Sequence, residues 1–181
     1  MVSHVWRGFA GACGVLAFVV GLAGSASAQE VSTNRVDAKT DWSVFEENDP
    51  RECWAVSTYK ESVNTQGARV VAVTRGDILL WVFYRPGNGI SGQVLFTGGY
   101  PFAPGSTVSV EIGASTFELF TEGEYAWPAT PADDAKIITA MKRGEAAVIT
   151  AQSSRGTTTK DTFSLLGFTA AVEEAESRCT S

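Results

Sequence analysis

The chain has 181 residues, of which 20 are acidic and 14 basic, so its formal net charge is −6. An acidic balance of this kind argues against nucleic acid and against anionic membrane surfaces as partners, because both need clusters of Lys and Arg to neutralise phosphates. Neither class of partner is expected.

The first 28 residues have the pattern of a cleavable secretory signal peptide. Arg7 lies in a short polar start, an apolar run extends from Phe9 to Ala23, and small side chains at Ala26 and Ala28 meet the requirement of signal peptidase. We expect cleavage between Ala28 and Gln29. The mature protein would then be exported to the periplasm or the cell surface, without a membrane span after processing, because the apolar run is too short and too rich in glycine to cross a bilayer.

Cleavage would also remove His4, the single histidine of the chain. A mature protein without imidazole has no Ser-His-Asp or Cys-His catalysis, no histidine general base and no histidine metal ligand. The pair Asp133 and Asp134 is better explained by the N-terminus of a helix than by a calcium loop. The sequence therefore predicts no catalytic residue, no metal and no cofactor.

Two cysteines remain after cleavage, Cys53 and Cys179. In an oxidising compartment an isolated pair usually forms a disulfide, and two cysteines allow one connectivity. The alternative is a reactive thiol, for which the basic neighbour Arg178 is weak support. We predict a bridge from Cys53 to Cys179 that ties the C-terminal segment to an early strand.

Residues 29–40 are polar and without periodicity, so we expect a flexible leader before a single domain over residues 41–181. Short apolar or β-branched runs separated by turn residues then predict a series of strands. The expected strands are 42–45, 53–58, 69–74, 78–84, 107–112, 116–120, 147–152 and 158–165. Three pairs are expected to form hairpins: 69–74 with 78–84 at the centre of the fold, 107–112 with 116–120, and 147–152 with 158–165.

Two helices are expected among these strands. For residues 131–143, Thr130 supplies an N-cap and Pro131 suits the first turn, while Ile137, Ile138 and Met141 form a buried stripe. A shorter C-terminal helix is expected over residues 170–178. Many strands with few helices indicate a mainly β fold, an antiparallel β-sandwich or barrel-like domain.

Four segments together resemble a known family. They are Asp41-Trp42-Ser43-Val44, Cys53-Trp54-Ala55-Val56-Ser57, Met141-Lys142-Arg143-Gly144 and Ser164-Leu165-Leu166-Gly167-Phe168-Thr169-Ala170-Ala171. Over nearly the whole mature chain the sequence resembles the invasion-associated locus B family, small exported proteins of alphaproteobacteria. The resemblance implies a β-sandwich envelope protein with no established enzymatic activity. Many members carry further cysteines that are absent here, which leaves Cys53 without a local partner.

Glycine- and proline-rich segments at residues 85–92 and 98–105 are the most unusual local compositions. With Tyr84, Tyr100, Phe102 and Trp127 they form a candidate binding rim for a sugar or a peptide, because aromatic rings provide stacking surfaces. The alternative is that glycine and proline make turns while the aromatic side chains complete the core.

Glu122 and Glu124 lie beside two aromatic residues and suggest the paired carboxylates of a glycosidase, but in an acidic protein they are better explained as solvated turn residues. The favoured function is a non-catalytic exported envelope protein that contacts an unknown envelope or host protein or glycan, with a role in host-cell invasion or envelope maintenance. A factor that assembles other envelope components fits the same features. The alternative is a histidine-free periplasmic hydrolase that uses paired carboxylates.

Overall fold

The structure is a computed structural model that describes residues 34–180 of the chain. The expected signal peptide, its cleavage site between Ala28 and Gln29, and His4 lie outside the described residues. Within residues 34–180, none of the helices has the length and hydropathy needed to span a bilayer.

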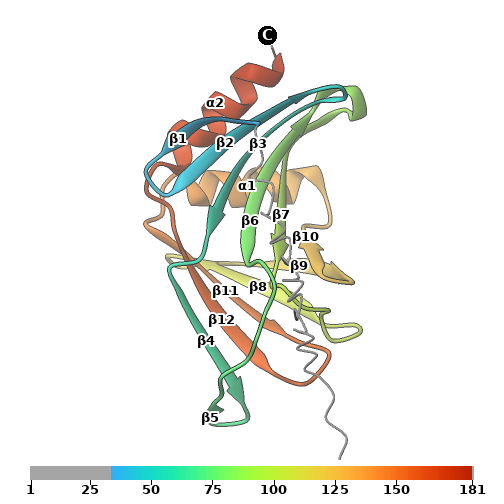
Figure 1. Cartoon of the computed structure of the whole chain (residues 1–181), viewed down its shortest axis with the longest axis vertical. Coiled ribbons are helices and arrows are strands. Elements are labelled where there is room, and N and C mark those ends of the chain that lie inside the picture. The colour runs from blue at the N-terminus through green and yellow to red at the C-terminus, as the bar shows by residue number, and fades with distance from the viewer. Residues whose placement is uncertain (1–33, 181) are drawn as a thin grey trace, which may run out of the picture. The chain divides into compact units, whose positions relative to one another are not determined.

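Twelve strands of the described region form one antiparallel sheet, which two α-helices accompany (Figure 1). In sheet order the strands are β1 (Arg35–Lys39), β2 (Trp42–Asn48), β3 (Arg51–Thr58), β6 (Leu79–Arg85), β7 (Ile90–Thr97), β10 (Tyr125–Trp127), β9 (Ser115–Glu122), β8 (Thr107–Ile112), β11 (Ala146–Gln152), β12 (Thr158–Ser164), β4 (Glu61–Gln66) and β5 (Arg69–Val70). The helices are α1 (Pro131–Met141) and α2 (Phe168–Thr180), and a 3₁₀ turn covers Pro86–Asn88. The mainly β, sandwich-like class predicted from the sequence is confirmed.

The sheet bends so that its two halves face one another. β3 and β4 are consecutive in the chain, yet β4 pairs with β12 in the other half of the sheet. The short link between them is held there by Lys60, whose backbone N–H donates to the carbonyl of Thr162 at 2.7 Å. In Figure 1 the strands β2, β3, β6 and β7 accordingly lie above β4, β11 and β12. Phe96 of β7 meets Phe163 of β12 edge to face, with 6.1 Å between ring centroids.

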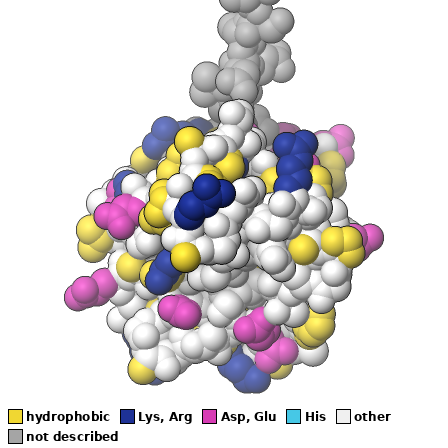
Figure 2. All heavy atoms as spheres, turned by 90° about the horizontal axis from the view of Figure 1, so that it is seen from below, with side chains coloured by type: hydrophobic (Ala, Val, Ile, Leu, Met, Phe, Trp, Pro, Cys, Tyr) yellow, Lys and Arg dark blue, Asp and Glu magenta, His cyan; other side chains and the backbone are white. Residues whose placement is uncertain are grey.

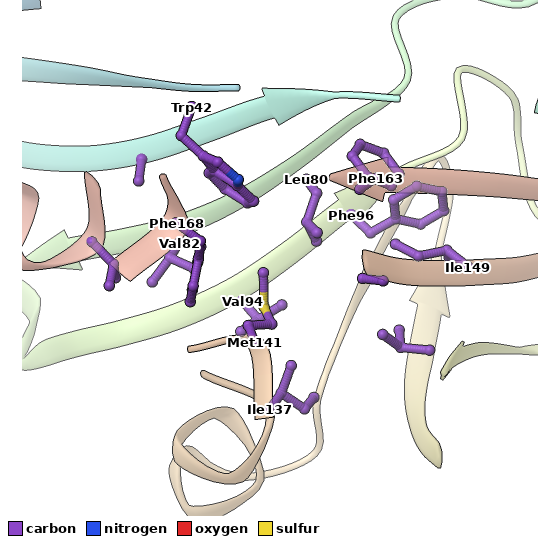
Figure 3. Close-up of a cluster of buried hydrophobic side chains, with 14 of the residues drawn as sticks. Trp42, Leu80, Val82, Val94, Phe96, Ile137, Met141, Ile149, Phe163 and Phe168 are labelled. Carbon is purple, nitrogen blue, oxygen red and sulfur yellow. The ribbon is translucent and has the colours of Figure 1, made fainter. Parts of the chain in front are cut away.

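Both helices cover the inner side of the sheet and complete the core (Figure 3). α2 packs on β2, β3 and β6, and α1 packs on β7. Trp42 and Phe168 are fully buried and meet edge to face at 4.8 Å between centroids. The predicted disulfide between Cys53 and Cys179 is present and ties the last turn of α2 to β3.

The internal helix forms where its capping signals predict it. The hydroxyl of Thr130 accepts from the backbone N–H of Asp133 at 3.3 Å, and Pro131 occupies the first turn. Ile137 and Met141 are buried as expected. The helix ends at Met141 rather than at residue 143, and α2 is longer at both ends than the predicted 170–178. In β8, Val108, Val110 and Ile112 are buried, as the alternation predicts.

The predicted flexible leader is too long, because Arg35–Lys39 form β1 and pair with β2. This strand is an edge strand whose side chains are mostly exposed, so it has no apolar alternation that would reveal it in the sequence. The ordered domain therefore begins before residue 41.

The central hairpin also differs from the prediction. Only Arg69–Val70 form a strand, β5, and it pairs with the polar strand β4 instead of with β6. β6 pairs with β7, which occupies part of the segment expected to be a loop. Glycine at positions 89 and 92 has positive φ, so the chain reverses within the 3₁₀ turn and resumes as a strand at once.

The first and last segments of the family resemblance lie together. The indole N–H of Trp42 donates to the carbonyl of Ser164 at 3.0 Å, and the backbone N–H of Asp41 donates to that of Leu166 at 3.2 Å. Gly167 has φ +87°, and a Cβ atom there would lie 2.0 Å from the carbonyl oxygen of Lys39. Only glycine permits this approach of two backbones.

Candidate functional site

A cavity of about 480 Å³ opens between four segments that are distant in the chain. We call it the polar groove. It is lined by Val73, Thr74, Arg75, Gly99, Tyr100, Pro101, Glu124, Ser153, Ser154, Arg155, Thr157 and Thr159. These residues come from the connection between β5 and β6, the segment after β7, the β9–β10 turn and the β11–β12 hairpin. Its size falls within the range of small-ligand sites.

Arg75 builds one wall of the groove and is fully engaged by neighbouring groups. Its two terminal nitrogens donate to the two carboxylate oxygens of Asp161 at 2.8 and 2.6 Å, and its Nε donates to the carbonyl of Gly98 at 2.8 Å. The side chains of this pair are only 6% and 0% exposed. In a buried pair of this geometry the carboxylate neutralises the guanidinium and holds it in place. Arg75 therefore has a structural role in the wall of the groove.

Tyr100 stands beside this ion pair. The guanidinium carbon of Arg75 lies 4.9 Å from the centroid of its ring, and its hydroxyl shares a hydrogen bond of 2.5 Å with Thr159 Oγ1. Burial is the main cause that raises the pKa of Tyr100, so the phenol stays neutral at ordinary pH. The ring is fixed in place and lines the groove as a neutral, partly exposed surface.

Hydroxyl groups of the β11–β12 hairpin make the floor. Ser153 Oγ accepts from the backbone N–H of Thr157 at 3.1 Å, and Thr157 Oγ1 accepts from Gln66 Nε2 at 3.2 Å. Ser153 and Thr157 are buried, whereas Ser154 is exposed. The floor thus combines fixed, internally bonded hydroxyls with one that faces solvent.

Two charged side chains stand at the rim, Arg155 and Glu124, and both are exposed. Neither forms an ion pair with a described residue. Glu124 is the single carboxylate among the residues that line the groove. Glu122 is also exposed but does not line it, so these two acids do not converge on a common ligand there. Over residues 34–180, no group of three His, Cys, Asp or Glu side chains is arranged to hold a metal ion.

The structure separates the four aromatic residues of the predicted rim. Tyr100 lines the groove, whereas Tyr84 and Phe102 are core residues with 5% and 6% exposure. Burial is also the main cause that raises the pKa of Tyr84. Trp127 is half-buried on β10, opposite Phe120 of β9. Three of the four thus lie away from the groove.

A second surface was missed by the sequence reasoning. Phe45, Trp54, Phe83 and Trp81 form a row of half-exposed rings across β2, β3 and β6, which we call the aromatic ladder. Centroids of successive rings lie 5.4, 5.9 and 6.1 Å apart. Because side chains alternate along a strand, the ladder lies on the face opposite to the one that α2 covers. Alternation of aromatic residues in neighbouring strands is the signal that would have revealed it.

A family model and a solved structure both relate this chain to the same group of proteins. A family model described as "Invasion associated locus B (IalB) protein" matches residues 42–176, more than half of the chain. The crystal structure of invasion associated protein b from Bartonella henselae is similar in fold, with a TM-score of 0.56 and 14% sequence identity over 80% of this chain and 98% of that one. No curated protein sequence shows a significant match.

Proposed function

The chain belongs to the invasion associated locus B family, and from this premise we propose that it is an exported, non-catalytic envelope protein that acts by contact with a glycan. The role would lie in host-cell invasion or in maintenance of the envelope. The observation that carries the proposal is the polar groove, a hydroxyl-rich cavity with a fixed tyrosine wall.

The chemistry of the groove suits recognition rather than turnover. Sugars present many hydroxyls, which pair with serine and threonine hydroxyls, with carboxylates and with guanidinium groups. Ser154, Arg155 and Glu124 offer these groups at the open side. Hydrolysis of a glycosidic bond ordinarily needs two facing carboxyl groups, and Glu124 is the one carboxylate that lines this cavity.

A glycan array probed with the processed chain tests this function. We expect saturable binding that Ser154→Phe removes, because a ring in place of the hydroxyl obstructs the groove. Ser115→Phe, at an exposed strand end outside the groove, is the matched control and should bind as the wild type does. Absence of binding across the array would overturn the glycan contact. Release of shortened saccharides would overturn the non-catalytic part.

Contact with a protein is a second candidate, which the aromatic ladder favours. Phe45 and Trp54 stack with their rings 2° from parallel, and Arg85 lies 4.4 Å from the centroid of Phe83. Neighbouring groups therefore occupy ring faces that a sugar would stack on, while apolar ring edges remain for a protein surface. Cross-linking in the periplasmic fraction should recover a partner that Trp54→Ser loses. Val63→Ser, an exposed apolar residue elsewhere on the sheet, serves as the control.

A further inference from the structure

We propose that the polar groove selects acidic sugars, with Arg155 binding the carboxylate of the ligand and Glu124 accepting hydrogen bonds from its hydroxyls. This inference rests on the proposed glycan contact and adds the chemical class of the ligand. Arg75 is paired with Asp161, whereas Arg155 and Glu124 form no ion pair with a described residue.

The charge of Arg75 is not offered to a ligand. Its guanidinium is bonded at two points to the buried carboxylate of Asp161, and Arg75 Nη1 also lies within hydrogen-bond distance of Ser62 Oγ and Asn64 Oδ1. A ligand that took one of these bonds would leave a buried acceptor without its donor, at considerable cost. Arg155 is therefore the cation of the groove that a ligand meets.

Arg155 is presented from a fixed turn. The backbone N–H of Ser153 donates to the carbonyl of Thr157, and that of Gly156 donates back to Ser153, both at 2.9 Å. The side chain of Arg155 is exposed. A planar guanidinium matches the two oxygens of a carboxylate, and a rigid base reduces the entropy lost on binding.

Arg155 and Glu124 are held on opposite sides of one short segment. The backbone N–H of Ser154 donates to the carbonyl of Pro101, and the backbone N–H of Phe102 donates to the carbonyl of Gly123, each at 2.9 Å. The turn that carries Arg155 and the turn that carries Glu124 are thus tied to adjacent residues. Backbone hydrogen bonds therefore set the spacing of the two turns that present the cation and the carboxylate.

This pairing distinguishes an acidic sugar from a simple anion. An ionised carboxylate accepts hydrogen bonds only, so Glu124 repels a bare anion but receives hydroxyl donors. A sugar acid carries both complementary groups: a carboxylate that Arg155 can bind and hydroxyls that can donate to Glu124. Figure 2 views the molecule from below, the end where β5 lies in Figure 1, and shows basic and acidic side chains interspersed. Selection would therefore be local to the groove and would not come from a field of one sign.

The test measures a ratio of affinities. Oligosaccharides that carry uronic or sialic acid are each compared with the methyl ester of the same molecule, which keeps the rings and hydroxyls but removes the charge. We expect the processed wild type to bind at least one acid about three- to tenfold more tightly than its ester, with the difference shrinking at high salt. Arg155→Gln should bring the ratio near one, and Glu124→Gln should raise it.

The outcomes separate the inference from the proposed function. If acids and esters bind equally well, or if Arg155→Gln keeps the preference, the acidic-sugar inference is overturned while glycan contact stands. If no oligosaccharide binds, both are overturned. Because each ratio is taken within one protein, a variant that is merely less stable leaves it unchanged, and Arg155→Lys should restore part of the preference.

Discussion

Arg75 and Asp161 form a two-point ion pair that joins the connection before β6 to strand β12, across a separation of 86 residues. The pair is buried between the two halves of the sheet and also supports Tyr100. One interaction therefore closes the fold and shapes the polar groove.

Arg75→Met should destabilise the domain by about 3–5 kcal/mol, because it leaves the Asp161 carboxylate buried without its partner. The double variant Arg75→Met with Asp161→Leu should recover part of this loss, since no charge is then left unpaired. Urea unfolding measures both free energies. Equal stability of the single variant and the wild type would show that the pair is not buried in solution.

Gly99→Ala should be far more costly than Gly105→Ala. Both glycines have nearly the same φ, +71° and +72°, so both variants carry the same backbone strain of about 1–2 kcal/mol. A Cβ at Gly99 would lie 2.5 Å from the carbonyl oxygen of Gly76, whereas one at Gly105 would meet nothing within 4 Å. The difference between the two unfolding free energies isolates the close approach of Gly76 and Gly99. A difference near zero would mean that the two backbones do not touch.

Removal of the bridge by Cys53→Ala with Cys179→Ala should destabilise the domain by about 4–5 kcal/mol on the chain-entropy model, because the two residues are 126 apart in the chain. Hydrogen exchange should rise first in α2, which the bridge ties to β3. Titration of the untreated wild type should find no free thiol. Two titratable thiols, or unchanged exchange in the variant, would contradict the expected role of the bridge.

Asp134→Asn should change how stability depends on pH. The carboxylate of Asp134 accepts from the backbone N–H of Val94 at 2.8 Å, and burial is the main cause that raises its pKa from 3.8 to about 6. A raised pKa in the folded state means that stability is lost as the pH rises from about 4 to about 6. The wild type should therefore lose, over that range, on the order of 2 kcal/mol relative to the variant, whose amide oxygen keeps the bond.

The measurement is the difference in unfolding free energy between the wild type and Asp134→Asn, taken from urea unfolding at each pH. The comparison removes the contribution of carboxylates far from Asp134. Asp37 and Asp41 have lowered pKa values and produce the opposite slope, but they are remote from Asp134 in the chain and do so equally in both proteins. Parallel curves for wild type and variant would show that Asp134 titrates normally.

The sequence predicted correctly those elements whose formation depends on neighbouring residues, such as a helix cap or an alternation of buried and exposed side chains. The cap at Thr130 located α1, and the alternation from Val108 to Ile112 located β8. β4 was missed because its residues are polar and their pairing with β12 depends on a strand that comes much later. The β-branched run from Arg69 to Thr74 predicted a full strand, but β5 ends at Val70. The backbone N–H of Val71 still donates to the carbonyl of Asn64 in β4 at 2.9 Å, and the following residues are irregular up to β6.

The site was less accessible to sequence reasoning for the same reason. The polar groove gathers residues near positions 75, 100 and 155, and nothing in their local patterns indicates that they meet. Tyr100 was identified as a candidate binding residue from its glycine-rich surroundings. Tyr84 adjoins the other glycine-rich segment, residues 85–92, but points into the core, because alternation in β6 places it on the inner face.

The direct passage from β3 to β4 has a consequence for the assembly of the domain. β4 leaves β3 early in the chain, yet the strand that satisfies its backbone, β12, is the last strand of the sheet. During synthesis, the edge of β4 that faces away from β5 would remain unpaired until nearly the whole domain has been made. Such a waiting edge is exposed to aggregation while the domain folds, because an unpaired strand can pair with another chain.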